Sequence, residues 1–193
     1  MKLVFATHNN NKFHEIKSLF PKKIKLLSLS EIGFKNKIIE NGNSLHENAF
    51  IKANFIKSKY GLNCFADDTG LEVFSLNNDP GIYSSRYAGS PINEKKNIKK
   101  LYNKLSKHNN RSARFRTIIS LIINQNNYYF EGIVNGKIND VIKGKNGFGY
   151  DPVFKPNGYN KTFAELSLKE KNLISHRSIA INKMLIFLDN FFK

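Results

Sequence analysis

Cysteine and long apolar stretches are scarce in this sequence, and each scarcity excludes a class of protein. There is a single cysteine, Cys64, so no intramolecular disulfide can form, and this usage fits a reducing compartment. The longest unbroken apolar stretches are short, such as residues 3–6 and 184–188, whereas a transmembrane helix needs about 20 such residues. The stretch 3–6 is also too short for the apolar region of a signal peptide. We therefore expect a cytoplasmic protein without a membrane partner.

Acidic residues and arginine are also scarce. The chain has 15 Asp and Glu against 31 Lys and Arg, a net charge of +16, which suggests a nucleic-acid-binding module. Only five of the basic residues are arginine, the usual residue for bidentate recognition of bases and phosphates. The lysines are scattered, and Asn, which shares A/T-rich codons with Lys, is about as abundant. Codon bias therefore accounts for the charge, and we expect no stable nucleic-acid complex; binding to nucleic acid stays as the alternative.

The residues that are abundant predict one folded domain. Of the 193 residues, 40% are hydrophobic and 12% aromatic, which is enough for a core and argues against disorder. No repeat, low-complexity segment or Pro/Gly linker marks a boundary, so we treat 1–193 as a single two-lobed domain. Helical and strand patterns interleave, and one hairpin is antiparallel. This arrangement predicts an α/β fold with a mixed β-sheet flanked by helices.

Hydrophobic spacing and end signals place the elements. The apolar patterns predict strands at 3–6, 63–66, 71–74, 113–123 and 128–135, and helices at about 11–20, 44–60, 90–105 and 175–192. Capping boxes, in which a Ser or Thr is followed three residues later by Glu, begin at Ser44, Thr162 and Ser167. Ser90 followed by Pro91 is typical of an N-cap with proline at the first helical position.

The first candidate site is a polar turn between a strand and a helix start. It consists of Thr7, His8, Asn9, Asn10, Asn11 and Lys12. A helix start presents free backbone N–H groups that suit an anion, and Lys12 adds a positive charge. The alternative is an ordinary polar turn with an N-cap, because the spacing matches neither a Walker loop nor a dinucleotide fingerprint.

The second candidate is the pair Asp67 and Asp68, which follow an apolar strand and precede Thr69. Two adjacent carboxylates are costly to bury unless a cation offsets them. Mg²⁺, which binds through one or two carboxylates plus substrate phosphates, would do so. The alternative is a turn at the end of a strand with solvated acids. Glu40 and Glu47 are further acids that either join this site or serve as surface and capping residues.

The third candidate is a glycine-rich segment with Phe148, Gly149, Tyr150 and Asp151. Its aromatic rings can stack on a flat ligand, and Asp151 can accept hydrogen bonds from a base edge. The alternative is a turn whose aromatic residues pack in the core.

The fourth candidate lies at the start of the last helix and consists of His176 and Arg177, with Lys171 shortly before them. His and Arg together can bind a phosphate or a purine carbonyl. Adjacent residues on a helix point in different directions, so Ser175 and His176 form a poor nucleophile pair, and Ser175 is more simply an N-cap. Lys52 lies one helical turn after Asn48, where it faces either the same site or solvent.

Taken together and in this order, the motifs resemble the inosine/xanthosine triphosphate pyrophosphatase family, the non-standard purine nucleotide pyrophosphatases. The matching segments cover nearly the whole chain: Thr7-x-Asn9-x-x-Lys12, Glu47-Asn48-Ala49 with Lys52, 66–71, 80–89, 147–152, 164–166, and Lys171 with 175–177. The resemblance implies an elongated fold of two lobes with a nucleotide cleft between them, usually as a homodimer. It also implies Mg²⁺-dependent hydrolysis of ITP, dITP and XTP to the monophosphate and pyrophosphate.

The resemblance also implies roles for individual residues. Thr7, Asn9 and Lys12 would hold the triphosphate, and Asp68 would be the general base and a metal-associated carboxylate, with Glu40 as a metal partner. Thr69 would touch the substrate, residues 148–151 would frame the base, and Lys171, His176 and Arg177 would contact base or phosphate.

One departure and two rivals stay open. His8 stands where members of this family often have glycine, so the phosphate turn is expected to have a different shape. The rival readings are a septum-type (Maf-like) nucleotide pyrophosphatase, which the Ser-His-Arg segment weighs against, and a degenerate member that binds nucleotide without turnover. The division of roles between Asp67 and Asp68 is also left open by the sequence.

Overall fold

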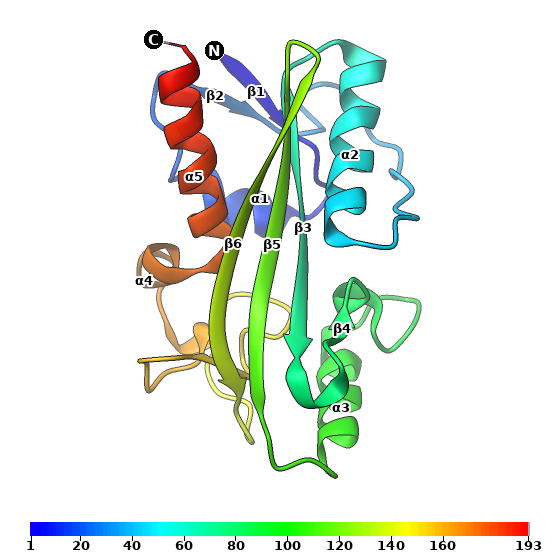
Figure 1. Ribbon diagram of the computed structural model, residues 1–193, viewed down its shortest axis with the longest axis vertical. Helices are drawn as coiled ribbons and strands as arrows, with labels where there is room; N and C mark the ends of the chain where they lie inside the picture. The colour runs from blue at the N-terminus through cyan, green and yellow to red at the C-terminus, as the bar shows by residue number, and fades with distance from the viewer. Residues whose placement is uncertain (193) are drawn as a thin grey trace. The chain divides into compact units, whose positions relative to one another are not determined.

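The computed structural model describes residues 1–192 and shows one mixed sheet with helices packed on it (Figure 1). The strands are β1 (Lys2–Phe5), β2 (Lys25–Leu27), β3 (Cys64–Val73), β4 (Asp79–Gly81), β5 (Ser112–Ile123), β6 (Asn126–Ile138) and β7 (Phe154–Pro156). The α-helices are α1 (Asn10–Lys17), α2 (Leu45–Tyr60), α3 (Glu94–Leu105), α4 (Leu168–Ile174) and α5 (His176–Phe191). Three short 3-10 segments lie at Phe74–Leu76, Ser84–Arg86 and Phe163–Glu165. The predicted α/β class with a mixed sheet is confirmed.

The order of strands across the sheet is β2-β1-β3-β5-β6-β7, with β4 paired to β3. β1 runs parallel to β2 and β3, whereas β4 is antiparallel to β3, and β7 is antiparallel to β6. The chain divides into two compact units. Unit 1 comprises residues 1–68, 117–132 and 177 onward, and unit 2 comprises 69–116 and 133–176.

In unit 1 the strand residues alternate between two cores. Phe5 and Phe65 pack with Ile16 of α1 and Met184 of α5. Their chain neighbours Val4 and Ala66 pack instead with Ala53 and Ile56 of α2. Since successive strand side chains point to opposite faces, α1 and α5 cover one face of this part of the sheet and α2 covers the other. In unit 2 a third core joins α3 to β3, β5 and the 3-10 segment at Phe163–Glu165.

Several of the predicted elements are confirmed. β5 and β6 form the predicted hairpin, with a shorter turn at Asn124 and Gln125, both of which have positive φ. The capping boxes at Thr162 and Ser167 are both present. The last helix begins at His176, directly after Ser175.

Three predictions at element boundaries are wrong. The two strands expected at 63–66 and 71–74 form the single strand β3, so Asp67 and Asp68 lie within a strand and not in a turn. α3 begins at Glu94 with Asn93 as its N-cap, not at Pro91. At Ser44 only half of the capping box forms, because the Glu47 carboxylate accepts from the backbone of Asn43 and not of Ser44. Among residues 1–192, none of the helices is both long and apolar enough to cross a membrane.

Candidate active site

Asp67 and Asp68 lie in the middle of β3, where alternation sends their side chains to opposite faces of the sheet. Asp67 is on the face of Phe65, toward α1 and α5, and Asp68 is on the face of Ala66, toward α2. The two adjacent carboxylates therefore meet different partners. The sequence left open how the two aspartates divide the roles of base and metal ligand, and the structure shows that their surroundings differ.

Asp67 is fixed by cations within unit 1. It is 1% exposed, and its two oxygens accept hydrogen bonds from Lys12 Nζ at 3.0 Å and from Arg177 Nε at 3.1 Å. Arg177 in turn donates to Glu15 of α1. Burial alone would raise the pKa of Asp67, but attraction to Lys12 and Arg177, and then to Lys52, outweighs it and holds that pKa well below its usual range. Asp67 is thus ionised at neutral pH, and both of its carboxylate oxygens accept hydrogen bonds from cations.

The polar turn before α1 brings Lys12 to this pair. Asn9 is the N-cap of α1, since its side chain accepts from the backbone N–H of Lys12 at 3.1 Å, and the Asn9 N–H donates to Thr7 Oγ1 at 3.2 Å. Asn10 and Asn11 are exposed in the first turn of the helix. Burial lowers the pKa of Lys12, which Asp67 partly restores. The turn therefore presents one half-buried ammonium group and the start of a helix, two features that suit an anion.

His8 is exposed and does not join this cluster of charges. Its Nε2 lies 2.8 Å from the backbone oxygen of Asn36, and its ring is 5.7 Å from that of Phe34. His8 thereby links the turn to the segment between β2 and α2.

Asp68 has a looser environment on the other face. Its Oδ1 lies 3.6 Å from Lys52 Nζ, and Lys52 donates to Glu40 Oε2 at 2.8 Å. Oδ2 of Asp68 is buried and has no hydrogen-bond partner among residues 1–192. Burial raises the pKa of Asp68, although Lys52 and Lys12 oppose it. Attraction to Asp68 and Glu40 outweighs burial and raises the pKa of Lys52, which stays protonated.

These residues fit a divalent cation of the oxygen-binding type. Asp68 offers an acceptor oxygen without a partner, and Glu40, with its side chain about one third exposed (34%), offers a second carboxylate that shares Lys52. Across residues 1–192 there is no group of three or more His, Cys, Asp or Glu side chains placed to hold a metal. Mg²⁺ does not require such a group, because it binds through one or two carboxylates plus substrate phosphates.

Unit 2 contains a second cluster of predicted residues. Lys171 Nζ donates to Asp151 Oδ2 at 2.5 Å, and both side chains are buried. The same ammonium lies 5.3 Å from the ring centroid of Phe148, whose backbone N–H also donates to Asp151 Oδ2 at 2.9 Å. Gly147 has a φ of +73°, and a Cβ there would collide with the Asp151 carboxylate, so the close approach requires glycine. This cluster combines a half-buried aromatic ring, an ammonium group and a carboxylate.

The other residues predicted for this cluster are placed as follows. Tyr150 is 4% exposed in the core of unit 2, and its hydroxyl donates to the backbone oxygen of Ser84 at 3.1 Å. The ring of His176 is 2% exposed and stacks on Phe115 with the centroids 4.5 Å apart. Gly149, with a φ of +64°, has open space where a Cβ would stand, and Thr69 is half-buried in β3. Tyr150 and His176 are therefore both packed inside unit 2, and their predicted contact with a ligand stays a prediction.

Two further buried residues of unit 1 are Glu15, which the sequence reasoning missed, and Asn48, which it placed one helical turn before Lys52 without giving it a role. Glu15 is buried beside Arg177, and its position three residues after Lys12, on the same side of α1, was the available signal. Asn48 is 1% exposed, and its Oδ1 accepts the backbone N–H of Gly42 at 2.9 Å.

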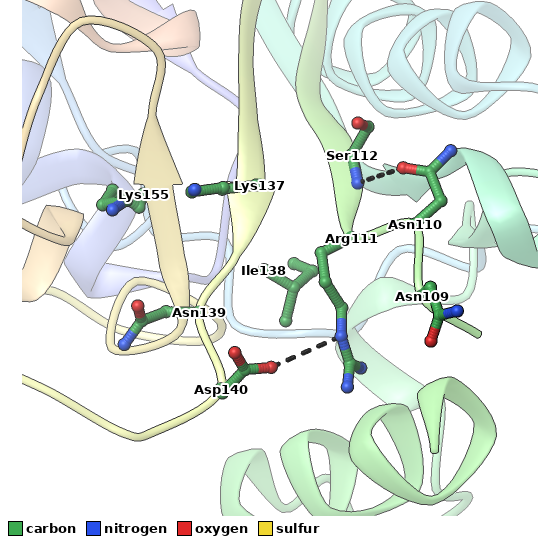
Figure 2. A pocket seen from close by; sticks show the side chains of 9 residues that line it. All are labelled: Asn109, Asn110, Arg111, Ser112, Lys137, Ile138, Asn139, Asp140 and Lys155. Atoms are coloured by element: carbon green, nitrogen blue, oxygen red, sulfur yellow. Dashed lines mark hydrogen bonds and ion pairs between the residues drawn. The ribbon is translucent and has the colours of Figure 1, made fainter. Parts of the chain in front are cut away.

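Unit 2 also has a polar pocket of about 310 Å³ that contains none of the predicted residues (Figure 2). Its lining residues are Asn109, Asn110, Arg111, Ser112, Lys137, Ile138, Asn139, Asp140 and Lys155. Arg111 turns toward Asp140, with Nε 3.4 Å from its carboxylate, whereas Lys137 and Lys155 project from paired positions of β6 and β7 (Figure 2). The cationic groups do not converge on one point, and we assign this pocket no ligand.

Comparison with known proteins identifies the family of the chain. The model of the Ham1 family matches residues 3–187. A protein of Christiangramia forsetii named dITP/XTP pyrophosphatase is 54% identical over 188 residues, which cover 97% of this chain and 99% of that protein. A protein of the same name from Flavobacterium psychrophilum is 50% identical over 190 residues, which cover 98% of this chain and 100% of that protein. The solved structure of the Staphylococcus aureus Ham1 protein is 40% identical, with a TM-score of 0.89 over 98% of this chain and 99% of that one. The chain belongs to the Ham1 family.

Proposed function

We propose that this chain hydrolyses non-standard purine nucleoside triphosphates (ITP, dITP and XTP) to the monophosphate and pyrophosphate, with Mg²⁺ as cofactor. Relatives that bear the name dITP/XTP pyrophosphatase match it over nearly its whole length. The observation that carries the proposal is the division of the two aspartates. Asp67 is held by Lys12 and Arg177, whereas Asp68 keeps a buried oxygen that has no partner within the described chain.

In this proposal the residues of unit 1 handle phosphate and water. Lys12, Asn9, Thr7 and Lys52 bind the triphosphate, with the exposed residues His8, Asn10 and Asn11 of the same turn beside them. Asp68 orients a water and takes its proton as the water oxygen attacks a phosphorus of the α–β anhydride, whose bond then breaks to release pyrophosphate. When bound by Asp68 and Glu40, Mg²⁺ would supply neutralisation of phosphate charge.

The residues of unit 2 recognise the base. Phe148 offers a ring for stacking, and Asp151, Lys171 and His176 offer polar groups, with Gly149, Tyr150 and Thr69 supporting them. Hypoxanthine and xanthine carry an acceptor oxygen at the purine 6-position, whereas adenine carries a donor amine there. A site that places a donor at this position leaves polar groups unpaired with adenine and so rejects it. Arg177, which also lies in the predicted base set, is placed to act through Asp67 and Glu15.

The test is pyrophosphate release from ITP, XTP, dITP, GTP and ATP with Mg²⁺. Asp68→Asn should lower kcat by at least about 100-fold, the typical contribution of a general base. Asp140→Asn, which removes a carboxylate with a side chain 79% exposed, is the matched control and should leave the rate unchanged. Equal turnover of ATP and ITP would contradict the base assignment, and no turnover of any nucleotide would contradict the activity and return the basic surface to consideration.

We further propose that the protein is a cytoplasmic homodimer, as the family resemblance implies. Exposed apolar side chains on α2, such as Phe50 and Phe55, are available for an interface between copies. Light scattering coupled to size-exclusion chromatography measures the mass directly, and a mass of 22.1 kDa at micromolar concentration would contradict the dimer.

A further inference from the structure

The segment that carries Glu40 is held in place almost entirely by α2. Ile38, 4% exposed, is the last residue of this connection buried in the core, and Ser44 is the N-cap of α2. Between them, residues 39–43 form neither helix nor strand. Three side chains of α2 contact this segment: Lys52 donates to Glu40 at 2.8 Å, Asn48 accepts from the Gly42 N–H at 2.9 Å, and Glu47 accepts from the Asn43 N–H at 2.7 Å.

Of these three contacts, the one to Asn48 involves the most buried α2 side chain. Asn48 is 1% exposed, whereas Glu47 is exposed and the Glu40 side chain is about one third exposed, so their interactions are weakened by solvent. Gly42 also lies very close to α2, because a Cβ there would stand 2.7 Å from Glu47 Cβ and 2.9 Å from Asn48 Oδ1. The backbone of Gly42 is therefore fixed by a partly buried hydrogen bond to a buried side chain, in a close approach that only glycine permits.

The chemical identity of Asn48 points to the same role. Nδ2 of Asn48 is buried and has no hydrogen-bond partner among residues 1–192, which costs free energy that a simple acceptor would avoid. Aspartate would also accept from Gly42, but it would bury a charged oxygen, which costs more free energy than the unpaired amide group. Residue 48 also lies one helical turn before Lys52 on the same face of α2, and a carboxylate there would compete with Glu40 and Asp68 for the Lys52 ammonium. The amide accepts from Gly42 without adding charge.

We propose that Asn48 is a positioning residue for Glu40: by fixing the backbone at Gly42, it keeps the Glu40 carboxylate beside Lys52 and in reach of the cation that Asp68 helps to hold. The catalytic consequence rests on the proposed function, whereas the placement of Gly42 does not. When the bond to Gly42 is lost, the hydrogen bonds described above leave residues 39–43 only those from Lys52 to Glu40 and from Asn43 to Glu47. Glu40 then moves away from Lys52, and Lys52 pairs more closely with Asp68. The Lys52 ammonium therefore competes with the cation for the Asp68 carboxylate.

The test compares Asn48→Ala with Asn48→Asp, Glu40→Gln and the matched control Asn54→Ala, an exposed asparagine on the same helix. The first readout is amide hydrogen exchange at Gly42, which does not depend on activity. Asn48→Ala should raise that exchange rate about tenfold, the ratio that corresponds to one ordinary hydrogen bond, and Asn48→Asp and Asn54→Ala should not. The second readout is direct binding of Mn²⁺, as a probe for Mg²⁺, which Asn48→Ala should weaken about tenfold.

The third readout is a double-mutant cycle on pyrophosphate release. If Asn48 acts through Glu40, Asn48→Ala has no further effect once Glu40→Gln is present. Asn48→Asp separates charge from geometry, since it keeps Gly42 protected but lowers activity by drawing Lys52 away. Unchanged exchange at Gly42 in Asn48→Ala, or an equal loss of activity in the Glu40→Gln and wild-type backgrounds, would overturn the proposal. An inactive wild type would refute the proposed function alone, because exchange at Gly42 would still report on Asn48.

Discussion

Replacing Asp67 and Asp68 one at a time by asparagine should separate folding stability from catalysis at two adjacent positions. Asp67 is 1% exposed and accepts from Lys12 at 3.0 Å and Arg177 at 3.1 Å. Asp67→Asn removes the charge that balances both cations. Removing one partner of a buried ion pair costs about 3–5 kcal/mol, and we expect the lower end because Arg177 keeps Glu15.

Asp68→Asn should behave in the opposite way. The carboxylate of Asp68 is buried, one of its oxygens has no partner in the described chain, and its pKa is raised, so its ionised form opposes folding at neutral pH. Lys52 keeps Glu40 at 2.8 Å in the variant. The expected change in the free energy of unfolding is below about 1 kcal/mol, because removal of the buried charge offsets the loss of the Lys52 ion pair at 3.6 Å, while pyrophosphate release is lost.

Urea unfolding followed by circular dichroism measures the free energy of unfolding of both variants. In a thermal melt of a chain of this size, a loss of about 3 kcal/mol corresponds to a melting temperature lower by about 6–12 °C, which should be seen for Asp67→Asn alone.

The effects of the two substitutions on stability depend on pH with opposite signs. The stabilisation from Asp67 is complete above the ordinary aspartate pKa of 3.8 and is lost as the pH falls below it, so the deficit of Asp67→Asn should shrink in acid. Stability of Asp68→Asn relative to wild type should improve as the pH rises through the raised pKa of Asp68. Equal destabilisation by both variants would refute this reasoning.

Two further predictions concern other buried groups. Lys171→Met removes the ammonium group that lies 2.5 Å from the Asp151 carboxylate, whose side chain is 3% exposed. The free energy of unfolding, measured in urea, should therefore fall by about 3–5 kcal/mol. The control Lys169→Met, at an exposed position of α4, should show no such loss. Cys64 is 0% exposed and burial raises the pKa of its thiol to about 12, so an aromatic disulfide reagent at pH 8 should label it only in urea; rapid labelling of the folded protein would contradict its burial.

Local signals in the sequence were enough for much of the fold. The β5–β6 hairpin follows from two long runs of β-branched and aromatic residues around a polar turn, and the capping boxes at Thr162 and Ser167 follow from side chains that bond within three residues. These features depend on contacts between near neighbours. The ordered motifs also indicated the family, which the comparisons confirm.

Where neighbouring signals competed, the sequence placed the boundary wrongly. Ser90 and Pro91 match the pattern of a helix start, yet Asn93 is the N-cap of α3, since its side chain accepts from the Lys96 N–H at 3.0 Å. Both segments carry valid N-cap residues, and a local rule does not rank them.

The surroundings of Asp67 and Asp68 were decided only by tertiary structure. Acidic residues and glycine are disfavoured in strands, so the sequence around them predicted a turn. Instead β3 continues through them, because Lys12 and Arg177, which lie 55 and 110 residues from Asp67 along the chain, balance the buried charge. Once the strand is continuous, alternation sends Asp67 to α1 and α5 and Asp68 to α2. The sequence by itself determined which residue types are available for the chemistry. The folded sheet decided that both oxygens of Asp67 accept from cations, whereas Asp68 keeps one buried oxygen without a hydrogen-bond partner among residues 1–192.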